Sequence, residues 1–222
     1  MKDKTYRYIL FDLDGTLTDS EEGIIACALH AFRELGKPAP PMSTLRKMLG
    51  PPLYKSFREI CGLPEDEAKR AVKVYRERYA DVGLFENKPY EGVTEMLSAL
   101  RDAGLTLAVS TCKPEPFAVR ILEKFGLSGY FAAVTGSGLD GSLDSKVEVI
   151  EETLSRLGCK DITCVLMVGD RKYDIEGAAA AGVDCIGARW GYAQEGELES
   201  YGVPLAESFS KLTELIIKGH SL

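Results

Sequence analysis

The chain has 222 residues, of which 45% are hydrophobic and 27% are charged. This composition is typical of a globular protein with a sizeable buried core. The net charge of −7 argues against nucleic acid polymers and anionic membrane surfaces as partners, because an acidic surface repels both.

Targeting signals and cysteine spacing bear on where the protein works. The chain starts without the uninterrupted apolar run of a signal peptide, and no segment reaches the ~20 apolar residues that span a bilayer. The six cysteines include no Cys-x-x-Cys pair, and two histidines accompany them, so we expect reduced thiols and no zinc cluster. A cytoplasmic protein that does not contact membranes is therefore expected.

Apolar segments alternate with helical ones along most of the chain. Segments rich in β-favouring residues predict buried strands, and segments of helical period that end at a glycine predict helices. This alternation predicts an α/β fold with a doubly wound parallel sheet, whose ligands bind at the carboxyl ends of the strands. In chain order, the strands are expected at Tyr8–Leu13, Leu105–Ser110, Ala132–Thr135, Thr163–Val168 and Asp184–Ala188, and the helices at Val93–Ala103, Pro116–Phe125, Lys146–Leu157, Ile175–Ala181 and Lys211–Lys218.

Residues 20–86 interrupt this alternation, because they contain amphipathic helices and no convincing strand. The polar segments on either side are plausible hinges. We therefore expect a catalytic core made of residues 1–19 and 87–222, with residues 20–86 inserted as an α-helical cap. The cap helices are expected near Glu21–Leu35, Ser43–Leu49, Leu53–Cys61 and Glu65–Asp81.

Asp12 and Asp14 follow the first predicted strand, in the segment Asp12–Thr16. Because side chains alternate along a strand, two residues that are two apart point to the same face. Such close carboxylates repel each other unless a cation neutralises them or one is kept protonated. An EF-hand calcium loop would need glycine at its sixth position, where this sequence has Leu17.

A second acidic pair, Asp170 and Asp174, follows the predicted strand Thr163–Val168. Asp170 comes at the carboxyl end of the strand, and Asp174 lies about one helical turn further on, so that both can face one ion. Magnesium is expected, since proteins usually hold it with one or two carboxylates, water and substrate phosphate. The alternative role for Asp174 is to cap the following helix.

Thr111 and Lys146 supply donors of the kind that phosphoryl transfer needs, because its transition state spreads negative charge over the equatorial oxygens. Thr111 follows the second predicted strand, and Lys146 opens a predicted helix. With the two acidic pairs, these residues form a complete set for phosphoryl transfer.

This set resembles, in order, the four motifs of the haloacid dehalogenase superfamily: Asp-x-Asp-Gly-Thr-Leu, a strand-end Thr, a Lys, and Gly-Asp-x-x-x-Asp. The resemblance implies that Asp12 is the nucleophile, and that Asp14 protonates the leaving oxygen and then activates water. It further implies that Thr111 and Lys146 hold the phosphoryl group. Mg²⁺ is then expected on Asp12, the backbone carbonyl of Asp14, and Asp170, with Asp174 binding directly or through water.

The inserted helices resemble the capped subclass, which includes phosphoglycolate phosphatases, 5′-nucleotidases and β-phosphoglucomutase. The segment from Val109 to Pro114 resembles the Thr-Asn-Lys-Pro segment of the phosphoglycolate phosphatase-like branch, with Cys112 in place of the usual polar residue. The resemblance implies that Cys112 contacts substrate, and that Arg46 and Lys47 of the cap are candidate ligands for a second anionic group.

The sequence therefore predicts a Mg²⁺-dependent phosphatase that acts on a small phosphomonoester, either like phosphoglycolate or a nucleoside monophosphate. A phosphomutase that uses the same aspartyl-phosphate is the first alternative. A receiver-like phospho-acceptor is the second, although its aspartate should lie midway along a domain without a helical insertion. Whether the protein is a monomer or a dimer stays open.

Overall fold

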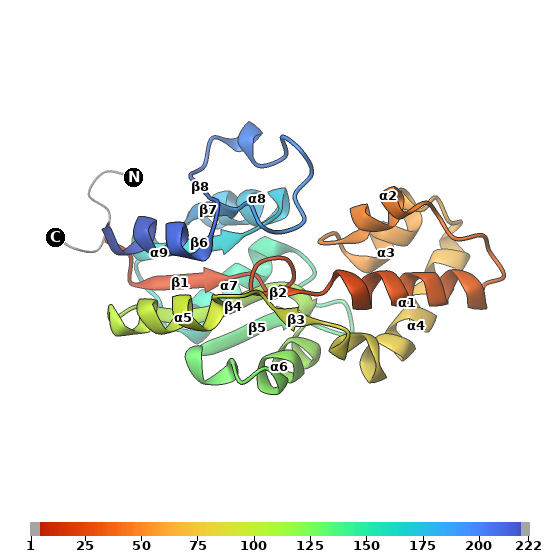
Figure 1. Cartoon of the computed structure of the whole chain (residues 1–222), viewed down its shortest axis with the longest axis horizontal. Coiled ribbons are helices and arrows are strands. Elements are labelled where there is room, and N and C mark those ends of the chain that lie inside the picture. The colour runs from red at the N-terminus through yellow and green to blue at the C-terminus, as the bar shows by residue number, and fades with distance from the viewer. Residues whose placement is uncertain (1–4, 219–222) are drawn as a thin grey trace. The chain divides into compact units, whose positions relative to one another are not determined.

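The computed structural model describes residues 5–218, and the chain forms two compact units (Figure 1). Residues Thr18–Lys88 make up the smaller unit, and the chain on either side of them makes up the larger one. Within residues 5–218, no helix combines the length and the apolar character needed to cross a membrane. The assignment of these units as catalytic core and cap stays a prediction.

The larger unit contains a parallel sheet of six strands in the order β5-β4-β1-β6-β7-β8. The strand β1 therefore has a parallel neighbour on each side, and the chain builds one half of the sheet before it builds the other. Ligands bind where the direction of building reverses, at the carboxyl ends of the strands. The strands are β1 (Tyr8–Phe11), β4 (Thr106–Pro114), β5 (Ala133–Ser137), β6 (Val165–Gly169), β7 (Asp184–Ala188) and β8 (Leu205–Ala206).

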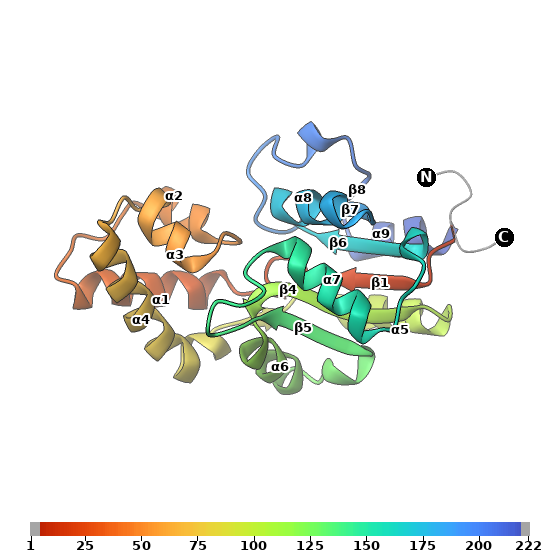
Figure 2. The ribbon, with the colours of Figure 1, turned by 180° about the vertical axis from the view of Figure 1, so that it is seen from behind.

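Helices cover both faces of this sheet. The helices α5 (Val93–Asp102) and α9 (Phe209–Lys218) pack together on the face seen in Figure 1. The helices α7 (Lys146–Arg156) and α8 (Lys172–Ala181) pack together on the opposite face, which Figure 2 shows. The helix α6 (Glu115–Lys124) joins β4 to β5. The expected α/β fold with a doubly wound parallel sheet is confirmed.

Burial on both faces explains why the central strands are almost continuously apolar. Ile9, Leu10 and Phe11 of β1 are fully buried, and all five residues of β6 are buried. A parallel sheet covered by helices leaves no face for polar side chains. The acidic residues of interest accordingly come just beyond the ends of these strands.

Local hydrogen bonds account for two differences from the expected boundaries. The strand β6 begins at Val165 instead of Thr163, because the Asp161 carboxylate accepts bonds from the Thr163 amide and hydroxyl and holds Ile162–Cys164 as a 3-10 turn. The helix α8 begins at Lys172 instead of Ile175, because Asp174 caps its first turn. Boundaries predicted from residue propensity and hydrophobic periodicity do not take such side-chain contacts into account.

The smaller unit is mostly helical. Its helices pack around an aromatic cluster, in which the rings of Phe32 and Phe57 are 5.9 Å apart and those of Tyr75 and Tyr79 are 5.4 Å apart. The expected helix 53–61 is instead one α-helical turn followed by a π-helical segment. The elements are β2 (Thr18–Asp19), α1 (Glu21–Glu34), α2 (Met42–Leu45), η1 (Arg46–Met48), α3 (Leu53–Lys55), η2 (Ser56–Ile60), α4 (Glu65–Asp81) and η3 (Gly83–Phe85).

Candidate active site

The loop after β1 brings the first acidic pair to the end of the sheet. The amide of Asp12 donates to the carbonyl of Val168 in the neighbouring strand at 2.9 Å, which fixes the position of the Asp12 backbone. Gly15 then turns the chain with φ +83°, a left-handed conformation that glycine adopts without strain. A Cβ atom at Gly15 would lie 2.3 Å from Oδ2 of Asp170, so the turn also needs glycine for this close approach.

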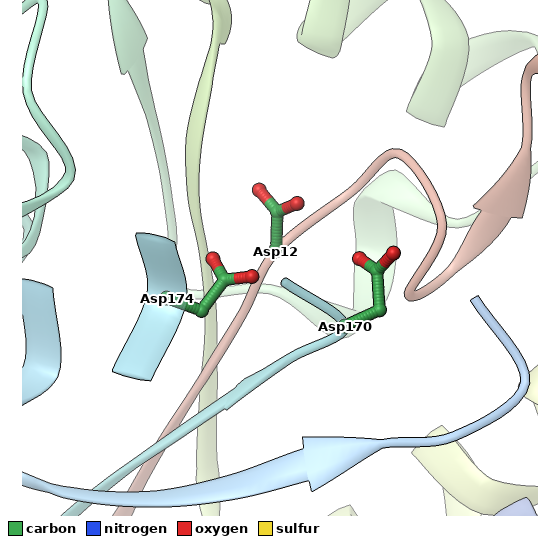
Figure 3. A group of neighbouring side chains, drawn as sticks. All are labelled: Asp12, Asp170 and Asp174. Carbon is green, nitrogen blue, oxygen red and sulfur yellow. The ribbon is translucent and has the colours of Figure 1, made fainter. Parts of the chain in front are cut away.

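Three carboxylates gather at this end of the sheet. One oxygen from each of Asp12, Asp170 and Asp174 lies within 4.8 Å of the others. Figure 3 shows that the three side chains point into the same space. Asp12 follows β1, Asp170 follows β6, and Asp174 lies in the first turn of α8. Together they are a group of carboxylates that can hold a metal ion.

Asp170 is fixed by two hydrogen bonds from segments distant in the sequence. The hydroxyl of Thr16 donates to its Oδ1 at 3.0 Å, and the amide of Tyr192 donates to its Oδ2 at 2.7 Å. Burial, with the nearby carboxylates of Asp174 and Asp12, still raises the pKa of Asp170 well above its ordinary value. The site therefore holds a carboxylate in a place where a negative charge without a cation is unfavourable.

Lys146 provides a positive charge beside these carboxylates. Its Nζ lies 2.8 Å from Oδ1 of Asp12 and 2.7 Å from Oδ1 of Asp174, and it donates to the carbonyl of Ser110 at 3.0 Å. Burial on its own would lower the pKa of Lys146, but the carboxylates of Asp12 and Asp174 outweigh this effect and raise that pKa. Lys146 is therefore a buried, permanently charged group in contact with the predicted nucleophile.

Asp174 has two contacts, which connect its two predicted roles. Its Oδ2 accepts from the amide of Arg171 at 3.0 Å and so caps α8, while its Oδ1 faces Lys146. Burial raises the pKa of Asp174, although the charge of Lys146 opposes the rise. Asp174 can therefore cap α8 and belong to the carboxylate group at the same time. Direct metal binding by Asp174 stays a prediction.

Thr111 and Cys112 lie on an extension of β4 beyond the expected end at Ser110. The register between β4 and β5 shifts after Ser110, so this segment leaves regular pairing at the edge where the carboxylates gather. The hydroxyl oxygen of Thr111 accepts from the amide of Lys113 at 3.2 Å, which leaves its own O–H to donate. Burial raises the pKa of Cys112 to about 11, and its carbonyl accepts from the hydroxyl of Ser137.

Asp14 pairs with a lysine to which the sequence analysis assigned no role. The Nζ of Lys113 lies 2.5 Å from Oδ2 of Asp14, and the side chains of Lys113 and Asp14 are 6% and 15% exposed. The sequence signal was present, because Lys113 belongs to the segment that resembles Thr-Asn-Lys-Pro. What the sequence could not show is that this lysine reaches a residue 99 positions away.

Arg46 and Lys47 belong to the smaller unit, in the 3-10 turn η1. The Nε of Arg46 lies 2.8 Å from Oε1 of Glu21, and the Arg46 side chain is 61% exposed. Lys47 is exposed. Arg46 is therefore partly neutralised by an acidic neighbour within its own unit, and a role for either residue in substrate binding stays a prediction.

The balance of charge in the larger unit suits a divalent cation. Asp12, Asp170 and Asp174 bring three negative charges when ionised, and Lys146 brings one positive charge. Two negative charges then remain in a buried place. Carboxylate oxygens are the ligands that Mg²⁺ prefers in proteins, so the residues present fit a magnesium ion.

Known proteins with similar sequences decide the family. The sequence model of the haloacid dehalogenase-like hydrolase family matches residues 9–188 of this chain. The chain belongs to this family. The expected resemblance to haloacid dehalogenase enzymes is therefore confirmed, and it covers the sheet from β1 to β7.

Individual relatives add detail. A 5′-nucleotidase from Pseudomonas aeruginosa is 43% identical over 203 residues, which are 90% of this chain and 91% of that protein. The crystal structure of a predicted phosphatase from Clostridium acetobutylicum has a TM-score of 0.91 and 40% identity, covering 96% of this chain and 99% of that one. The tyrosine-protein kinase PtkA of Mycobacterium tuberculosis is 38% identical over 207 residues, 93% of this chain and 70% of that protein. The chain is a phosphatase of the haloacid dehalogenase-like family.

Proposed function

We propose that this haloacid dehalogenase-like phosphatase hydrolyses a small phosphomonoester with the help of Mg²⁺, through an aspartyl-phosphate on Asp12. The observation that carries the proposal is the contact of Lys146 with Asp12, beside the carboxylates of Asp170 and Asp174. An anionic nucleophile, a buried ammonium and a group of carboxylates that can hold a metal together suit the transfer of a phosphoryl group.

The metal is assigned to Asp12, Asp170 and the backbone carbonyl of Asp14, with Asp174 binding directly or through water. When bound, Mg²⁺ supplies electrostatic stabilisation of the phosphoryl oxygens. The rigid anchoring of Asp170 by Thr16 and Tyr192 supports this assignment, because ligands held by surrounding hydrogen bonds bind metal more tightly.

The residues divide the chemistry into two steps. An oxygen of Asp12 attacks phosphorus, the bond from phosphorus to the leaving oxygen breaks, and Asp14 gives its proton to that oxygen. Asp14 then takes a proton from water, whose oxygen attacks phosphorus and releases Asp12 together with inorganic phosphate. Lys146 and Thr111 hold the phosphoryl oxygens throughout, since both present donors at the same edge of the sheet.

The substrate is proposed to be phosphoglycolate-like or a nucleoside monophosphate. The 5′-nucleotidase relative supports the second class, since it is 43% identical over nine-tenths of the chain. Arg46 and Lys47 are proposed to bind a second anionic group of the substrate.

Hydrolysis of p-nitrophenyl phosphate tests the mechanism directly. We expect Mg²⁺-dependent release of p-nitrophenol by the wild-type chain, and a loss of at least about 1,000-fold in Asp12→Asn, since an amide cannot form the covalent intermediate. The matched control is Asp102→Asn, because Asp102 is an exposed residue at the end of α5. Turnover in Asp12→Asn similar to that of Asp102→Asn would overturn the assignment of the nucleophile.

A substrate panel separates the remaining activities. Phosphoglycolate, nucleoside 5′-monophosphates and hexose phosphates are compared by their kcat/KM. Conversion of β-glucose 1-phosphate to glucose 6-phosphate with a bisphosphate primer would favour the phosphomutase alternative. The name of the mycobacterial relative is that of a tyrosine-protein kinase. Transfer of a phosphoryl group from ATP to a tyrosine peptide would show that a tyrosine side chain, instead of water, accepts that group from this chain.

A further inference from the structure

Lys113 reaches the predicted acid–base residue through a buried contact. Its Nζ lies 2.5 Å from Oδ2 of Asp14, and its side chain is 6% exposed. A hydrogen bond between an ammonium and a carboxylate is short and strong, and it carries directional preference. A lysine in this place therefore has an effect on how the Asp14 carboxylate is oriented.

The two oxygens of Asp14 differ in their surroundings. Oδ2 is bonded to Lys113, whereas Oδ1 is buried and has no hydrogen-bond partner among the described residues. A buried polar atom without a partner is unfavourable, and it commonly marks a place that a ligand or water fills. The contact with Lys113 thus leaves Oδ1 as the oxygen of Asp14 that has no bond to a group of the protein.

The backbone fixes Lys113 where this contact is possible. Lys113 lies on the extension of β4 after the register shift, and its amide donates to the hydroxyl oxygen of Thr111. A Cβ atom at Gly136 would lie 2.5 Å from the carbonyl oxygen of Lys113, so the neighbouring strand packs closely on the Lys113 backbone. Little freedom remains for the backbone at Lys113 to move away from Asp14.

We propose that Lys113 is a positioning residue that holds Asp14 by Oδ2 and so directs Oδ1 at the leaving oxygen of the substrate. The inference rests on the proposed function, since it requires Asp14 to carry a proton on Oδ1 and to give it to that oxygen while Oδ2 keeps the bond from Lys113. Without Lys113 the carboxyl group rotates about its Cβ–Cγ bond, and Oδ1 is no longer held in one direction. Proton transfer is sensitive to such misplacement, and a displacement of about 1 Å costs about 100-fold in rate.

The need for this proton depends on the leaving group. An alkoxide is a strong base and leaves slowly unless it is protonated, whereas p-nitrophenolate is stable without a proton. Loss of the positioning contact must therefore slow the first step for alkyl phosphates much more than for p-nitrophenyl phosphate. A loss of folded protein would instead lower both rates by the same factor.

The experiment compares Lys113→Met and Lys113→Arg with the wild-type chain on two substrates. The first is p-nitrophenyl phosphate, and the second is the alkyl phosphomonoester that the wild type hydrolyses best. The control is Lys160→Met, because Lys160 is exposed in the loop that follows α7. The quantity measured is the ratio of kcat/KM on the alkyl substrate to kcat/KM on the aryl substrate, which reports the first step and does not depend on the fraction of folded enzyme.

We expect Lys113→Met to lower this ratio by about 30-fold or more. Lys113→Arg should restore part of the ratio, and Lys160→Met should leave it unchanged. An equal loss of kcat/KM on both substrates would overturn the positioning role. A wild-type chain that hydrolyses neither ester would instead refute the proposed function, so the two failures are distinguishable.

Discussion

At the scale of single residues, the site depends on how closely the loop after β1 approaches Asp170. Gly15 has no side chain where a Cβ atom would meet Oδ2 of Asp170 at 2.3 Å and the ring of Tyr192 at 2.7 Å. The same residue has φ +83°. Glycine is therefore needed at this position for two reasons: the left-handed backbone conformation and the lack of room for a side chain. A matched pair of substitutions can measure the two effects separately.

Gly15→Ala is expected to lower the free energy of unfolding by more than Gly104→Ala does. Gly104 has φ +84°, and a Cβ atom there would meet no atom of the described residues within 4 Å, so Gly104→Ala incurs only the strain of the left-handed conformation, about 1 kcal/mol. Gly15→Ala adds a collision that displaces Asp170. Urea unfolding of both variants measures the difference, and equal losses would contradict the role of close packing.

At the scale of elements, α7 presents Lys146 from its first turn. The hydroxyl of Ser145 accepts from the amide of Glu148, and the carboxylate of Glu148 accepts from the amide of Ser145. This capping box satisfies amides that the helix leaves without partners. The position of the ammonium beside Asp12 thus depends on residues that do not touch the site.

Ser145→Ala is expected to destabilise the chain by about 1 kcal/mol, the usual effect of losing a helix cap. Because the first turn of α7 also frays, kcat on p-nitrophenyl phosphate should fall by a few-fold. Ser145→Thr keeps a capping hydroxyl and is the control. Denaturant unfolding and steady-state kinetics provide the two measurements, and unchanged stability in Ser145→Ala would show that the box does not hold the turn.

The sequence predicted the elements better than it predicted their contacts. Alternating apolar and helical segments indicated the parallel sheet, because strands that are buried on both faces are almost continuously apolar in sequence. The strands β2, β3 (Lys88–Pro89) and β8 have two residues each, which is too short for any periodicity. The pairing of Lys113 with Asp14 depends on the register shift in β4, and such a shift is set by tertiary packing.

At the scale of the whole molecule, folding brings three carboxylates together at an unfavourable electrostatic cost. Burial is the main cause of the raised pKa values of Asp170 and Asp174. The folded state therefore binds protons more tightly than the unfolded state, and the free energy of unfolding falls as the pH rises above the ordinary carboxyl pKa of about 4. A cation that binds the ionised carboxylates should oppose this loss.

Mg²⁺ is accordingly expected to raise the Tm of the wild-type chain more at pH 8 than at pH 5, where protons compete for the same carboxylates. Thermal unfolding with Mg²⁺ and with EDTA at both pH values measures the effect. Asp170→Asn should remove most of the gain from Mg²⁺, whereas Asp102→Asn should keep it. An equal gain at both pH values would argue against binding to carboxylates with raised pKa.

The order of the strands has a consequence for how the protein is made. The strand β1 lies between β4 and β6, and it is synthesised about a hundred residues or more before either of them. Until Val165–Gly169 emerge from the ribosome, one edge of β1 has no permanent neighbour, and the carboxylate group beside Asp12 lacks Asp170 and Asp174. The carboxylate group is therefore completed late, and the nascent chain depends on avoiding strand pairing with other chains in the meantime.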